Sequence, residues 1–213
     1  QSTTDSAAAA WSTISGQTAT TYTASSLTAT TWYRAIVTSG VCTSATSSVA
    51  KVTVNPATVT GTASGDTVVC ASGNSVTVRL SGNVGSIQWQ SSTNNVNFTS
   101  VSGATGASYT ASNLTTTTYY RARVKSGVCD SLFSNVVTVT LNPIAVGGTV
   151  GGSTTVCYGT NTTALTLSGH FGTIQWQSSI LSTTAGFSNV GDSSRTTLIA
   201  SNLTATTYYR AVL

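Results

Sequence analysis

The chain repeats its own text at a fixed interval, and this interval limits the possible folds more than any other feature of the sequence. "WYR" at 32–34 returns as "YYR" at 119–121, 87 positions later. "IQWQSS" at 87–92 returns at 174–179 with the same spacing. A third "YYR" begins at Tyr208, 89 positions after Tyr119, because the loop after the second "IQWQSS" is two residues longer. Such periodicity indicates a tandem array of one structural unit.

The repeat divides the 213 residues into one whole unit and two parts. Residues 57–143 form a complete unit, residues 1–56 match the C-terminal part of another, and residues 144–213 match the N-terminal part of a third. Asn-Pro at 55–56 and again at 142–143 marks the boundaries, where proline suits a short linker because it cannot donate to a continuing strand ladder. We therefore expect a segment of a longer array.

The middle unit reads as a series of short β-strands separated by turn residues. "SVTVRLSG" from Ser75 and "TYYRARVK" from Thr118 alternate apolar and polar residues, which is typical of strands with one buried face. About seven such segments fit into the unit, the number expected of an antiparallel β-sandwich. The predicted fold class is all-β, with tandem immunoglobulin-like antiparallel β-sandwiches.

Aromatic residues place this sandwich among immunoglobulin-like folds. Trp89, with its equivalent Trp176, stands on the strand where such folds bury a tryptophan. Tyr120 follows Leu114 by six residues, the spacing of a tyrosine corner, in which the phenol hydroxyl bonds back to the backbone near the leucine. Tyr33 and Tyr209 occupy the equivalent positions in the other two units.

The four cysteines recur with the repeat. Cys70 and Cys157 come early in a unit, whereas Cys42 and Cys129 come late. We predict a Cys70–Cys129 disulfide inside the complete unit, with Cys42 and Cys157 paired to residues outside this segment. An alternative joins Cys42 to Cys70 across the linker. Paired cysteines would indicate an oxidising, extracellular setting.

Charge is sparse and carries little chemistry. Charged residues make up 6% of the chain, and the net charge of +4 reflects eight Lys and Arg against four Asp, with no Glu. Arg121, Arg123 and Lys125 alternate on one strand, which predicts a solvated sheet face rather than a nucleic-acid track, since a track needs denser charge and stacking aromatics. Glycan contact by such outward arginines and tyrosines is the less favoured interpretation.

No catalytic, metal or cofactor site is predicted. The aspartates do not recur at equivalent positions, so neither an acid–base pair nor a calcium cage is indicated. The single histidine, His170, falls in an expected loop, and nothing marks a serine nucleophile. Neither a signal peptide nor an apolar run long enough to span a membrane is present. Four N-glycosylation sequons match by pattern in this Thr-rich chain, at Asn97, Asn113, Asn161 and Asn202.

Together, "VC…SVTV…IQWQ" and "NLTTTTYYRARVKSGVCDS…SNVVTVTLNP" resemble the immunoglobulin-like repeats of giant cell-surface adhesins of the Bacteroidota, such as the SprB-type gliding-motility adhesins. The resemblance covers nearly the whole chain. It implies export by the type IX secretion system, an extracellular location at the cell surface, and a long filament used in adhesion or gliding. It also implies O-glycosylation where Asp is followed by a hydroxyl residue and an aliphatic one, which makes Ser6, Thr67 and Ser131 candidate sites.

The expected function is that of a non-catalytic, stiff spacer in such a filament. Its partners would be neighbouring repeats, with surface polysaccharide and the gliding or secretion machinery contacted through other regions, and with neither nucleic acid nor membrane insertion. One alternative is a carbohydrate-binding module of a secreted hydrolase, which would need an exposed aromatic platform, with Trp11 as its candidate. A self-assembling sheath or fibre subunit is the other alternative.

Overall fold

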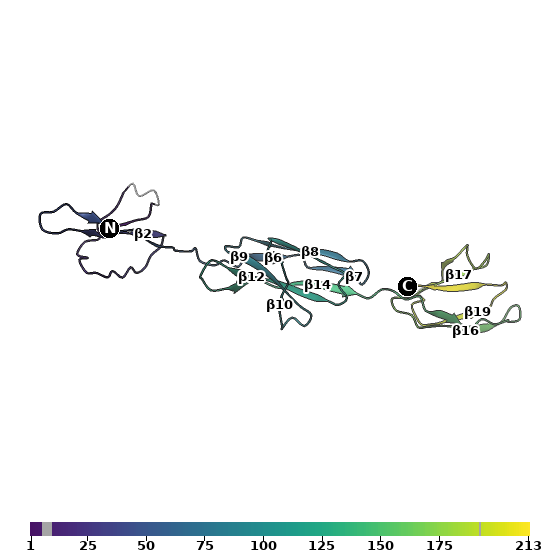
Figure 1. Ribbon diagram of the computed structural model, residues 1–213. Coiled ribbons are helices and arrows are strands. Elements are labelled where there is room, and N and C mark those ends of the chain that lie inside the picture. Colours follow the sequence, from purple (N-terminus) through teal and green to yellow (C-terminus); the bar gives the residue numbers. More distant parts are fainter. Residues whose placement is uncertain (6–9, 192) are drawn as a thin grey trace. The chain divides into compact units, whose positions relative to one another are not determined.

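A computed structural model describes residues 1–5, 10–191 and 193–213. Every regular element of these residues is a β-strand, and most strand pairs are antiparallel. By contact density the chain divides into two compact units, 1–67 with 75–112 and 116–140, and 68–74 with 113–115 and 141–213. Figure 1 shows the strands of the three repeats.

The larger sheet of the middle repeat is built around its longest strand, β12. Strand β9 lies on one side of β12 in antiparallel register, with Ala122 opposite Trp89 and Arg121 opposite Gln90. Strand β14 lies on the other side, with Thr118 opposite Val139. The order across the sheet is β10 (Thr99–Ser100), β9 (Ser86–Ser92), β12 (Thr118–Lys125), β14 (Val137–Asn142) and β7 (Thr67–Cys70), with β13 (Leu132–Phe133) pairing β12 beyond β14's range.

The smaller sheet has β8 (Ser75–Ser81) between β11 (Ser108–Ser112) and β6 (Thr62–Ser64). Val78 is fully buried while its neighbour Arg79 is exposed, so the alternation read from the sequence defines an inner face. On β12 the same alternation buries Ala122 and Val124 and turns Arg123 outward. The two inner faces make an immunoglobulin-like β-sandwich, the predicted fold class.

The tryptophans of the "IQWQ" segments lie in the centre of two of these cores. Trp89 is fully buried, and its indole N–H donates to the carbonyl oxygen of Gly106 at 3.0 Å. Trp176 is equally buried and donates to Arg195 O at 2.8 Å. A large ring whose single polar atom is satisfied can be buried at little cost.

Each outer repeat contains a subset of these strand pairs. In the first, β2 (Thr31–Tyr33) lies between β1 (Ser2–Thr3) and β5 (Ala50–Val52), and β3 (Ile36–Val37) pairs β4 (Ala45–Thr46). The third has two three-stranded sheets: β15 (Thr149–Gly151), β16 (Thr162–Ser168), β19 (Thr197–Ser201); and β18 (Ser188–Asn189), β17 (Gln175–Ser179), β20 (Tyr208–Val212). Its core joins Trp176 to the leucines of β16 and β19.

An asparagine holds the corner that precedes β12. The side-chain amide of Asn74 donates to Cys70 O at 3.1 Å and to Leu114 O at 2.9 Å, and its Oδ1 accepts from the Leu114 N–H at 2.7 Å. Asn161 makes the same three bonds in the third repeat, to Cys157 and Leu203. We call these three-bond contacts the asparagine clamps.

The predicted tyrosine of the corner is part of the core. Tyr120 is 2% exposed, and its ring lies against Tyr109 with 5.8 Å between centroids. Tyr33 and Tyr22 repeat this tilted pair at 5.7 Å in the first repeat. Burial, together with the neighbouring Tyr109 phenol, raises the pKa of Tyr120 to about 12. Among the described residues the Tyr120 hydroxyl has no hydrogen bond, so the predicted bond to the backbone near Leu114 is not formed, and the Asn74 side chain bonds that backbone instead.

The cysteines contradict the predicted Cys70–Cys129 disulfide, because all four are free thiols. Cys70 ends β7 where the chain leaves the sandwich, since the next residue, Ala71, donates to Asn142 O at 2.9 Å. Cys129 follows β12 at the end where the chain enters the sandwich, and its Sγ lies 3.6 Å from Pro56 O.

Strands β14 and β12 run between these two places, from Asn142 to Val139, across to Thr118, and on to Lys125. At ~3.3 Å per residue this path separates the two thiols by roughly 30 Å, whereas the Cα atoms of a disulfide lie within about 7 Å. The prediction failed because the cysteines recur with the repeat but lie at opposite ends of it. The alternative Cys42–Cys70 bond is also not formed.

Candidate functional site: arginine stacks and a basic strip

One arrangement of side chains recurs on the outer sheet face of all three repeats, and it involves the arginine of each "YR" segment. Arg121 donates from Nε to the Oε1 of Gln90, its neighbour across the strand pair, at 2.9 Å. Arg34 and Gln1 form the same bond at 2.8 Å, and Arg210 and Gln177 form it at 2.9 Å. We call each arginine, with its glutamine and aromatic partners, an arginine stack.

Each arginine also covers an aromatic ring. The guanidinium carbon lies 4.2 Å from the ring centroid of Trp11 in the first repeat, 4.1 Å from Phe98 in the second and 4.1 Å from Phe187 in the third. Arg121 has a second ring, Phe133, at 4.0 Å. A planar, weakly hydrated guanidinium suits such stacking, which ammonium groups match poorly.

The stacks have a chemical consequence for the predicted ligand platform. Trp11 was the candidate surface for a sugar ring, but Arg34 lies over one of its faces. The hydrogen bond from Arg34 to Gln1 fixes that arginine in place. Arg34, Arg121 and Arg210 are therefore engaged within their own repeats, and the stacks hold neighbouring strands together.

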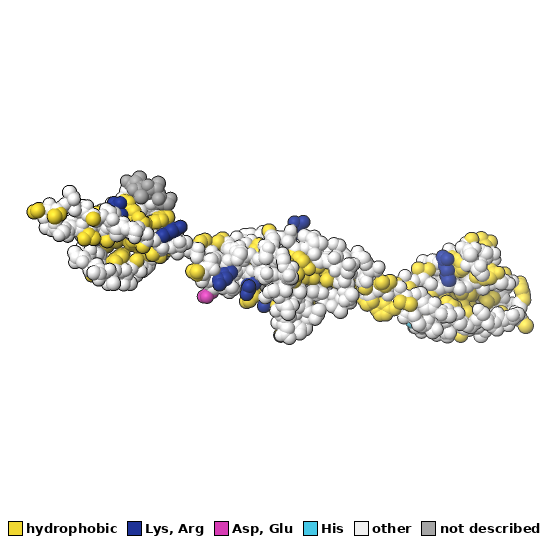
Figure 2. All heavy atoms as spheres, in the orientation of Figure 1, with side chains coloured by type: hydrophobic (Ala, Val, Ile, Leu, Met, Phe, Trp, Pro, Cys, Tyr) yellow, Lys and Arg dark blue, Asp and Glu magenta, His cyan; other side chains and the backbone are white. Residues whose placement is uncertain are grey.

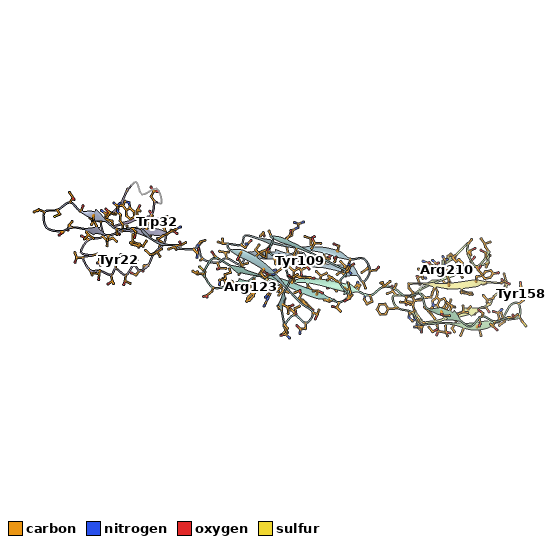
Figure 3. The ribbon with its side chains drawn as sticks, in the orientation of Figure 1. Tyr22, Trp32, Tyr109, Arg123, Tyr158 and Arg210 are labelled. Carbon is orange, nitrogen blue, oxygen red and sulfur yellow. The ribbon has the colours of Figure 1, made fainter. Side chains whose placement is uncertain are left out.

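Two further cations of β12 differ from the stacked arginines. Arg123 and Lys125 continue the outward row from Arg121 and are exposed. Among the described residues, neither side chain has a hydrogen bond or an ion pair in the structure. Figure 2 shows dark-blue side chains gathered on the part of the middle repeat where Figure 3 labels Arg123. We call Arg121, Arg123 and Lys125 the basic strip.

The first repeat contains a cavity lined partly by core positions of the fold. It measures about 740 Å³ in the first repeat and is lined by Tyr22 and Tyr33, among others. Their counterparts Tyr109 and Tyr120 pack inside the middle sandwich, where β8 supplies Val76 and Val78. A smaller cavity of about 360 Å³ in the third repeat is lined by Leu165 and Tyr209. Both linings combine core positions of the fold with residues of the arginine stacks, Arg34 in the first repeat and Arg210 in the third.

The candidate modification positions are in different surroundings. Thr67 is exposed at the start of β7, and the carboxylate of Asp66 before it accepts a hydrogen bond from the Thr138 N–H at 2.8 Å. Ser131 is half-buried, and Ser6 lies outside the described residues. Of the sequon asparagines, Asn161 forms a clamp through its side-chain nitrogen, which excludes a glycan there in the folded repeat.

Other predicted positions form no cluster. His170 is half-buried in the loop after β16. Within the described ranges, His, Cys, Asp and Glu nowhere come together in a group that could hold a metal ion. The same ranges contain no helix that could cross a bilayer. Sequence reasoning missed the asparagine clamps and the arginine stacks, although Asn four residues after an early cysteine and the Gln of "IQWQ" both recur with the repeat.

Comparison with known proteins gives one family. No curated protein matches the chain. A crystal structure of chicken CNTN1 FN1-FN3 domains matches at 14% identity with a TM-score of 0.33, over 85% of this chain and 68% of that one. The sequence model of a domain of unknown function, DUF8696, matches three times, at residues 1–56, 59–143 and 146–213. The chain therefore belongs to the DUF8696 family and carries this domain in tandem.

Proposed function

We propose that this segment is a non-catalytic spacer in a secreted, surface-anchored filamentous adhesin, with gliding motility or adhesion as the purpose of the whole. The observation that carries the proposal is the repetition of the arginine stacks. In three successive repeats an arginine is hydrogen-bonded to a glutamine and lies over an aromatic ring. Residue types that often contact ligands are used here to hold strands together.

Such internal bonding suits a module that must keep its shape while its neighbours are displaced. In tandem repeat proteins, stability comes from within each unit and from contacts between adjacent units. The length of such a protein therefore increases with the number of units. In this proposal the partners of the segment are neighbouring repeats. Adhesive contacts and the gliding or type IX secretion machinery belong to other regions of the parent protein.

The exposed location of Thr67 supports it as the first candidate for O-glycosylation, and half-buried Ser131 is the second. Glycans on spacer domains would protect them from proteases outside the cell. Intact mass of the chain purified from its native host tests this part, and a mass equal to that of the bare sequence would refute it.

Localisation tests the spacer proposal as a whole. An antibody raised against residues 57–143 is applied to intact cells of the producing organism, before and after brief protease treatment. We expect surface labelling along thin filaments, which protease removes. Labelling that appears only after the cells are permeabilised would contradict a surface filament. A catalytic activity assigned to this segment in purified form would contradict the non-catalytic role.

A further inference from the structure

We propose that the basic strip of the middle repeat binds an acidic polysaccharide. The strip lies on the outer face of β12, where alternate residues point the same way. Its three cations therefore repeat every ~7 Å along one face of the strand. This inference does not depend on the spacer role, because a spacer needs no ligand.

A comparison within the chain shows that the fold does not require this charge. The arginine of the stack is present in every repeat, at Arg34, Arg121 and Arg210. The position of Arg123 holds Ile36 in the first repeat and Val212 in the third. The position of Lys125 holds Thr38 in the first repeat.

Arg123 and Lys125 are thus additions to a strand that forms without them. Both are exposed, and the described residues offer them neither an ion pair nor a hydrogen bond. The exposed acidic residue nearest in sequence is Asp130, in the turn after β12. Two unpaired cations beside a fixed third one favour a partner that carries several negative charges.

The surroundings favour a polysaccharide over a nucleic acid. Single-stranded nucleic acids need a series of free aromatic faces on which successive bases stack. Here Arg121 already lies over Phe98 and Phe133, at 4.1 and 4.0 Å. Phe133 is still 46% exposed and lies opposite Arg123 in the strand register, so it offers one apolar surface beside the cations. Carboxylates on a sugar chain match the planar fork of Arg123.

The test measures binding of the full chain to immobilised polygalacturonate at low ionic strength. The informative variant carries Arg123→Ile and Lys125→Thr, which are the residues of the first repeat. The matched control carries Arg79→Thr and Arg195→Thr, two exposed cations elsewhere, and so has the same net charge. A third variant, Asp130→Asn, removes the nearby negative charge. Because all substituted side chains are exposed, folding should be preserved, and circular dichroism checks this.

We expect the strip variant to bind about tenfold more weakly, the sum of two modest surface contacts, and the control less than twofold more weakly. Asp130→Asn should bind more tightly, and 0.5 M salt should abolish binding by the native chain. Equal losses in the strip variant and the control, or no binding by the native chain, would overturn the proposal. So would equal or tighter binding to poly-glutamate or to single-stranded DNA at the same salt concentration.

Discussion

The asparagine clamp gives the sharpest test of how each repeat is held together. Asn74 is 8% exposed and bonds to three backbone groups, Cys70 O, Leu114 O and Leu114 N–H. The change Asn74→Ala leaves all three without this partner. At about 1 kcal/mol for each bond, we expect the middle repeat to lose ~3 kcal/mol of stability. For a domain of this size that corresponds to a fall of roughly 12–24 °C in its melting temperature.

Hydrogen exchange followed by mass spectrometry is the suitable assay, because it reports on each repeat separately. Amides of β8 and β12 that exchange through global opening should exchange about a hundredfold faster in Asn74→Ala, whereas those of β16 and β19 should be unchanged. Asn161→Ala should give the reciprocal pattern, because that clamp makes the same three bonds. Loss below ~1 kcal/mol in both variants, or equal acceleration in both repeats, would refute the reasoning.

Three other predictions follow from the packing. Arg121→Lys keeps the charge but loses the Gln90 bond and the stacking on two rings, so it should lower the free energy of unfolding in urea by ~1–2 kcal/mol. This loss should exceed that of Arg210→Lys, which loses stacking on one ring, and the opposite ranking would contradict the stacks. The unfolded, non-reduced chain should react with a thiol reagent at four cysteines, and only two reactive thiols would support the predicted disulfide. The raised pKa of Tyr120 means that the folded repeat disfavours the phenolate, so stability is full below pH 10 and falls between pH 10 and about 12. Between pH 9 and pH 11.5 the native chain should therefore lose ~2 kcal/mol more of its unfolding free energy than Tyr120→Phe loses, and equal losses would exclude this residue as the cause.

The strand pattern was predictable because it follows from alternation along single segments. Val78 beside Arg79, and Val124 beside Arg123, show the inner and outer faces directly in the sequence. The burial of Trp89 needed only its place between two polar glutamines on a strand. Both properties are local, so they do not depend on how the strands are arranged.

The cysteine pairing was not predictable from spacing, because it depends on which end of the sandwich each residue reaches. Cys70 ends an edge strand that precedes the core strand β8, and Cys129 lies past the end of β12. A repeat shows that two cysteines recur together, but it carries no distance between them. The clamp of Asn74 was missed for the same reason, since its partner Leu114 is 40 residues away.

Mechanical unfolding of single molecules tests the central claim most directly, namely that each repeat is a separately folded module able to carry load. The chain is pulled from its two ends, and the length released at each rupture is measured. With no internal disulfide, rupture of the domain at 59–143 should release its whole length, a contour of roughly 300 Å. A Cys70–Cys129 bond would restrict the release to roughly 90 Å. A distinct rupture with the long release supports the account, whereas smooth extension without ruptures, or the short release, would contradict it.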